Sequence, residues 1–133
     1  MIMDNLQKIF DDVAKSRNEE RKLKDKYFGD IKKKSLDFIN STYEKLLFLN
    51  EKGFKVYKSD ANDMYFYIDY PYGIHTATSK ITSTFVSYTY LGEKHFYPST
   101  DKGFIVDWFN RDDADWKSYK TLEELVKAYA EKS

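Results

Sequence analysis

Residues 64–70, MYFYIDY, decide the fold of this chain. Their side chains alternate with a period of two, which is the pattern of a β-strand with one buried face. Met64, Phe66, Ile68 and Tyr70 share the face that we expect to pack against helices, whereas Tyr65, Tyr67 and Asp69 share the other. Tyrosine favours strands and combines an apolar ring with a polar tip. The stretch therefore predicts a sheet that presents phenols on its uncovered face.

Further strands are predicted on both sides of this stretch. Bulky side chains between turn signals indicate strands over residues 54–58, 94–98, 104–110 and 115–120, with 74–79 and 81–91 forming one strand or two. Residues 101–103 are predicted to form a turn. The connections are too short for parallel crossovers. We therefore expect an antiparallel, Tyr-rich meander of five to seven strands.

Two helices are predicted ahead of the sheet. Residues 3–27 carry an apolar stripe that we expect to pack against the second helix or against a copy of itself. The stripe consists of Met3, Leu6, Phe10 and Val13. Gly29 with Asp30 interrupts the pattern, and a second helix follows over residues 31–52 with Gly53 as its C-cap. Residues 1–28 are therefore predicted to form a projecting arm.

A third helix is predicted at the C-terminus. Thr121 and Glu124 have the spacing of a capping box, in which the Thr121 hydroxyl accepts from a helical N–H and the Glu124 carboxylate accepts from the N–H of Thr121. Two helices, the meander and this last helix make an α+β fold. A chain of 133 residues is the size of a single domain, so we assign residues 1–133 to one domain.

The composition excludes several classes of function. The absence of Cys removes disulfides, thiol catalysis and thiolate zinc sites. The 22 Lys and Arg balance the 22 Asp and Glu, so no net field attracts nucleic acid, and Arg17, Arg21 and Arg111 are the only arginines. No apolar run approaches the roughly 20 residues of a membrane span, and no signal peptide is evident. We therefore expect a cytoplasmic protein without membrane association.

The residues predicted to bind a partner lie in the sheet. Phenols offer a large contact area at a low cost in rotamer entropy. Tyr88 and Tyr90 alternate with Phe85 and Leu91, so we expect Phe85 and Leu91 to face the helices. The segment around residues 108–116 adds an acidic patch flanked by Trp. The predicted partner-binding residues are Tyr65, Tyr67, Tyr88, Tyr90, Trp108, Asp112, Asp113, Asp115 and Trp116.

Catalysis and metal binding have little support in the sequence. His75 and His95 are the only histidines, and no Lys or Arg neighbour is evident as a transition-state clamp. The Asp residues between 107 and 115 lack the Asp-x-Asp-x-Asp-Gly frame and the distal Glu of a calcium loop. Turn formation explains them instead. We therefore predict no catalytic residue, no metal site and no cofactor.

These observations favour a non-enzymatic domain that binds another protein. Small size and neutral charge fit an inhibitor, immunity or accessory protein of a bacterium or its phage. Two alternatives stay open: a single-stranded nucleic-acid-binding protein whose sheet tyrosines stack on bases, and a small hydrolase dependent on His75 and His95. A homodimer through the N-terminal helix also stays open.

Overall fold

The computed structural model describes residues 2–72, 77–90, 92–110 and 114–132. A long helix, α1 (Ile2–Leu46), continues into a 3₁₀ helix, η1 (Leu47–Lys52), and α2 (Leu122–Lys132) ends the fold. Between them lie five strands that pair in chain order, each antiparallel to its neighbours. They are β1 (Lys55–Lys58), β2 (Tyr65–Asp69), β3 (Ala77–Tyr90), β4 (Glu93–Asn110) and β5 (Ala114–Tyr119). The α+β class is confirmed, and the described sheet has five strands where the sequence left five to seven open.

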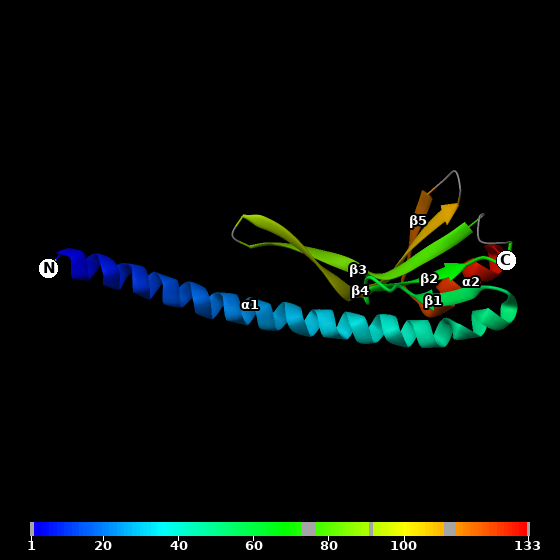
Figure 1. Ribbon diagram of the computed structural model, residues 1–133, viewed down its shortest axis with the longest axis horizontal. Helices are drawn as coiled ribbons and strands as arrows, with labels where there is room; N and C mark the ends of the chain where they lie inside the picture. The colour runs from blue at the N-terminus through cyan, green and yellow to red at the C-terminus, as the bar shows by residue number, and fades with distance from the viewer. Residues whose placement is uncertain (1, 73–76, 91, 111–113, 133) are drawn as a thin grey trace.

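Both helices pack against one face of the sheet, which we call the inner face (Figure 1). Phe38 of α1 stacks on Phe104 of β4 with ring centroids 4.6 Å apart. On α2, the hydroxyl of Tyr129 shares a hydrogen bond with Ser79 of β3. Phe66 and Ile68 of β2 lie in the same layer and are 1% and 0% exposed, as the alternation of residues 64–70 predicts. The opposite, outer face has no helix against it in the described part of the chain.

The two helices predicted ahead of the sheet are one helix, so the predicted interruption at Gly29 and Asp30 is wrong. Glycine inside a helix costs about 1 kcal/mol relative to alanine. An uninterrupted helix, however, brings Phe28 onto the sheet layer, where it is 9% exposed and stacks on Tyr97 of β4 at 4.4 Å. Burial of a large aromatic ring contributes about 1.5–3 kcal/mol, which exceeds the local cost of glycine.

The predicted N-terminal stripe is not buried against another helix of the same chain. Leu6, Phe10 and Val13 are 61%, 72% and 57% exposed. The side chain of Met3 lies outside the described part of the structure. Figure 1 shows the N-terminal part of α1 running on beyond the sheet.

The strands β3 and β4 form one long hairpin with an irregularity in its middle. β4 continues through residues 101–103, where the sequence predicted a turn. The register passes from Ser83↔Phe104 to Thr84↔Ser99, so residues 100–103 bulge out of β4. Alternation on β3 reverses at this point: Phe85 is 45% exposed and lies on the outer face, so the prediction that it faces the helices is wrong.

Two predicted helix caps are present with modifications. Gly53 has a φ of 95° and its N–H donates to the carbonyl of Asn50, but it caps η1 rather than the α-helix. At α2 the N–H of Glu124 donates to the Thr121 hydroxyl at 3.2 Å. The Glu124 carboxylate accepts from the N–H of Lys120 at 3.3 Å, one residue before the predicted donor.

Candidate functional site

One row of side chains on the outer face crosses all five strands. The strand pairs Tyr57↔Tyr67, Tyr67↔Lys80, Lys80↔Asp107 and Asp107↔Trp116 set its members side by side. Directly opposed residues of antiparallel strands point to the same face. The row therefore runs from two tyrosines through a central pair of charges to a tryptophan.

Lys80 and Asp107 neutralise each other at the centre of this row. The Lys80 ammonium lies 3.6 Å from the Asp107 carboxylate, and the two side chains are 31% and 30% exposed. The same ammonium lies 5.1 Å from the ring centroid of Tyr65. A partly exposed ion pair contributes only about 0–1 kcal/mol to stability. Its effect here is to orient Lys80 and to leave the centre of the outer face without net charge.

Three half-buried tyrosines form a packed cluster beside this ion pair. The rings of Tyr57 and Tyr67 stack with centroids 5.4 Å apart, and Tyr65 meets Tyr67 edge to face at 5.4 Å. Hydrogen bonds with Ser59 and Tyr67 lower the pKa of Tyr65, whereas the hydrogen bond with Tyr65 raises the pKa of Tyr67. Rings that pack on one another offer less free surface for stacking on bases, so the cluster suits a protein partner better than single-stranded nucleic acid.

A groove with a volume of 510 Å³ lies on the outer face beside the row. Two of its lining residues, Phe85 and Trp116, are 45% and 63% exposed. Its apolar lining also includes Met64, Tyr65 and Ile105, and its polar lining includes Lys80 and Asp107. Exposed aromatic surface of this kind, bordered by polar groups, is typical of a site that binds a partner.

The predicted partner-binding residues fall into three groups. Tyr65, Tyr67 and Trp116 lie on the outer face, and Asp115 is exposed on β5, where its carboxylate accepts from the N–H of Trp116 at 2.8 Å. Trp108 lies in the core. Asp112, Asp113 and the side chains of Tyr88 and Tyr90 lie outside the described part of the structure.

Trp108 packs inward because it alternates with the outward-facing Asp107. It is 6% exposed, and its indole N–H donates a hydrogen bond to the hydroxyl of Tyr70. The ammonium of Lys132 lies 4.8 Å from the centroid of the Trp108 ring on the α2 side. Trp108 therefore holds α2 and the sheet together and is not available to a partner on the outer face.

Sequence reasoning missed most of the groove, including Met64, Lys80, Phe85 and Ile105. Ile105 alternates with the buried Phe104 and Val106, so the strand pattern contains the signal for its outward direction. Met64 was predicted on the inner face, but β2 begins only at Tyr65, so the alternation does not extend to it.

Of the two histidines, His95 alone lies within the described residues. His95 lies opposite Tyr88 on the hairpin, with its Nε2 3.7 Å from the Glu93 carboxylate. His75 lies outside the described residues. Within the described ranges, no three His, Asp or Glu side chains are placed to hold a metal ion.

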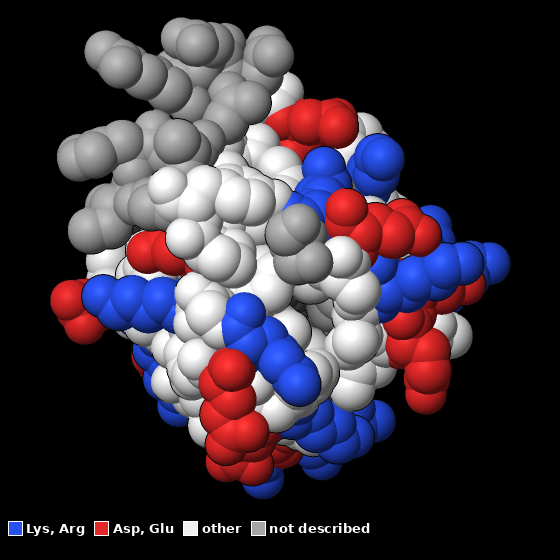
Figure 2. All heavy atoms as spheres, turned by 90° about the vertical axis from the view of Figure 1, so that its right-hand side faces the viewer, with Lys and Arg blue, Asp and Glu red and all other residues white. Residues whose placement is uncertain are grey.

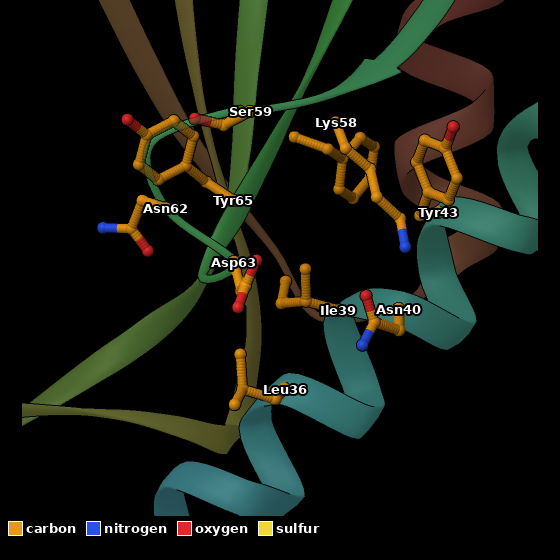
Figure 3. A pocket seen from close by; sticks show the side chains of 10 residues that line it. Leu36, Ile39, Asn40, Tyr43, Lys58, Ser59, Asn62, Asp63 and Tyr65 are labelled. Carbon is orange, nitrogen blue, oxygen red and sulfur yellow. The ribbon is translucent and has the colours of Figure 1, made fainter.

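A second, polar hollow of 250 Å³ lies between α1 and the loop after β1 (Figure 3). Tyr43 of α1 faces Lys58, whose ammonium lies 5.1 Å from the Tyr43 ring centroid. The Asn62 side chain accepts from the N–H of Met64 at 2.8 Å, so it holds the loop. In the described part of the chain, two buried side-chain hydroxyls lack a hydrogen-bond partner, those of Ser35 and Ser83. Neither residue lines this hollow. The outer groove exposes two large aromatic side chains, Phe85 and Trp116, so we favour it as the candidate site.

At the end of the molecule that carries α2, the described surface has charged side chains of both signs. Figure 2 shows Lys and Arg interspersed with Asp and Glu around an uncharged centre. Nucleic-acid-binding surfaces need clustered positive charge. Among the described helices, including the 45-residue α1, none has the length and hydropathy needed to cross a membrane.

Comparison of the chain with family models finds no match. Comparisons with curated proteins and with solved structures also find no significant match. Function must therefore be inferred from the outer face itself.

Proposed function

We propose that this chain is a non-enzymatic domain that binds another protein through the outer face of its sheet. The groove carries the proposal: Phe85 and Trp116 expose their rings beside a neutral ion pair, on a face that no described helix covers. Large exposed aromatic side chains are the residues that most often supply binding free energy at protein interfaces.

The chemistry of the groove favours an apolar segment of the partner. Lys80 and Asp107 already satisfy each other, so a charged side chain placed between them would have to compete with an existing ion pair. Met64, Phe85 and Ile105 instead offer apolar surface. The hydroxyl groups of the tyrosine cluster supply hydrogen bonds at the margin, as in other interfaces with an apolar centre and a polar rim.

The biological role that fits such a domain is that of a small inhibitor, immunity or accessory protein of a bacterium or its phage that acts in the cytoplasm. Proteins of this kind act by occupying a surface of their target and need no catalytic group. The mixed charges at the end that carries α2 (Figure 2) and the packed tyrosine rings give the nucleic-acid alternative less support.

The test compares capture of the partner from a lysate of the source organism by four forms of the chain: the parent, Phe85→Ala, Trp116→Ala and Phe48→Ala. Phe48 is the matched control because it is 42% exposed but belongs to the helix layer. Loss of a central interface aromatic removes about 2 kcal/mol or more, roughly thirtyfold in affinity. We expect both outer-face variants to lose the partner while their melting temperatures stay close to that of the parent.

Two results would contradict the proposal. One is capture that is equal for the parent and both outer-face variants. The other is salt-sensitive binding of single-stranded oligonucleotides that Trp116→Ala or Phe85→Ala abolishes, which would assign the face to nucleic acid.

A further inference from the structure

The N-terminal part of α1 presents a surface that the sheet does not use. Residues 5–27 contain no buried side chain, and Phe28 is the first described residue of α1 to be buried. The N-terminal end of this segment runs on beyond the sheet in Figure 1. Most of the stability of helices in proteins comes from tertiary packing rather than from helix propensity. The segment therefore lacks the main source of helix stability unless a second surface packs against it.

The apolar side chains of this segment follow a heptad pattern. Steps of three and four residues from Leu6 define one seam, which consists of Leu6, Ile9, Val13, Ser16, Glu20, Leu23 and Tyr27. Its apolar members and Tyr27 are 57–71% exposed. Such steps keep side chains along the line where two helices pair. When the seam is reversed, the apolar residues Leu6 and Ile9 lie opposite Tyr27 and Leu23, whereas Val13 lies opposite Glu20.

The charges along the segment distinguish the two orientations of a second copy. Residues 4–12 hold three Asp and one Lys, a net charge of −2. Residues 15–26 hold six Lys or Arg and three Asp or Glu, a net charge of +3. Paired helices lie about 8–10 Å apart, close to the Debye length of about 8 Å at physiological ionic strength, so these charges interact. A parallel pair sets +3 beside +3, whereas an antiparallel pair sets −2 beside +3.

We infer that the arm of α1 pairs with the arm of a second copy of this chain in antiparallel orientation. The end of the seam at Leu6 and Ile9 then packs against the end at Leu23 and Tyr27 of the other copy. The polar middle of each seam lies at the centre. A self-complementary surface of this kind closes as a two-fold dimer and leaves no open end for further growth.

Sedimentation equilibrium of the full chain tests self-association, with Val13→Asp as the variant and Gln7→Asp as its control. Both residues are exposed, and each variant adds one carboxylate to the arm, but Gln7 lies off the seam. We expect a dimer for the parent and for Gln7→Asp, and at least tenfold weaker dimerisation for Val13→Asp. A parent that is monomeric at every concentration, or equal dissociation constants for the two variants, overturns the inference.

Disulfide trapping tests the orientation, and the chain suits it because it contains no native Cys. Single-cysteine variants Asn5→Cys and Lys26→Cys are mixed under mild oxidation and the products are weighed by mass spectrometry. Antiparallel pairing brings residue 5 of one chain level with the region of residue 26 of the other, so the mixed disulfide should dominate. A dominant Asn5→Cys homodimer would show parallel pairing and overturn the inference.

Discussion

Replacing Gly103 by Ala should destabilise this fold, whereas the same change at Gly29 should stabilise it. Gly103 lies in the bulge of β4 with a φ of 86°. A Cβ built there would lie 2.7 Å from the Cα of Lys120 and closer still to the carbonyl oxygen of Tyr119. Both are backbone atoms at the end of β5, so no side-chain rotation relieves the contact.

Two effects set the magnitude at Gly103. A non-glycine residue in the left-handed region costs about 1–2 kcal/mol. Forcing a methyl group into a filled space costs about 1–3 kcal/mol more. We therefore expect Gly103→Ala to lower the free energy of unfolding by about 3 kcal/mol. For a chain of this size that corresponds to a melting temperature about 10 °C lower.

Gly29 provides the matched comparison because it lies inside α1 and an added Cβ meets no atom within 4 Å. Alanine there should raise the free energy of unfolding by up to about 1 kcal/mol. Urea denaturation followed by tryptophan fluorescence and circular dichroism measures both variants. A Gly103→Ala midpoint equal to that of the parent would refute the described approach of β4 to β5. A lower midpoint for Gly29→Ala would refute a continuous α1.

Two further predictions concern the last helix and the core. Thr121→Ala should lower the free energy of unfolding by about 1 kcal/mol, because the N–H of Glu124 loses its acceptor. Thr121→Ser keeps a hydroxyl and should leave the urea midpoint unchanged. Equal midpoints for the parent and both variants would count against the cap. Burial raises the pKa values of Tyr70 and Tyr129 above the ordinary value of 10. Above pH 10 the unfolded chain therefore loses phenol protons that the folded chain retains. The free energy of unfolding then falls as the pH rises. Between pH 10 and about pH 12, the free energy of unfolding of Tyr129→Phe should therefore fall less steeply than that of the parent. Parallel curves of unfolding free energy against pH would show that the Tyr129 hydroxyl does not cause the fall.

The sequence predicts those parts of the fold that local patterns determine. Alternation in residues 64–70 identifies Phe66 and Ile68 as core, and both are almost fully buried. Short connections lead to an antiparallel sheet in chain order, which the structure has. The capping residues Gly53 and Thr121 are found at helix ends because their preferences depend on neighbouring residues alone.

The remaining features depend on contacts between distant residues. Gly29 stays helical because Phe28 packs on Tyr97, which is far away in the chain. Alternation on β3 reverses at Ser83 and Thr84 because of the residues that bulge from β4. For this reason the sequence indicates Tyr65, Tyr67 and Trp116 on the outer face but assigns Phe85 to the wrong one.

The two proposed interfaces lie on different parts of the molecule and differ in physical character. Pairing of the arms uses complementary charges and an exposed seam on α1, so added salt should weaken it. Binding in the groove uses apolar surface around the neutral pair of Lys80 and Asp107, so it should depend little on salt. Because α1 packs on the inner face, a dimer of arms leaves the groove of each sheet open. On a target that carries two matching sites, the second binding step of such a dimer would be intramolecular and correspondingly stronger.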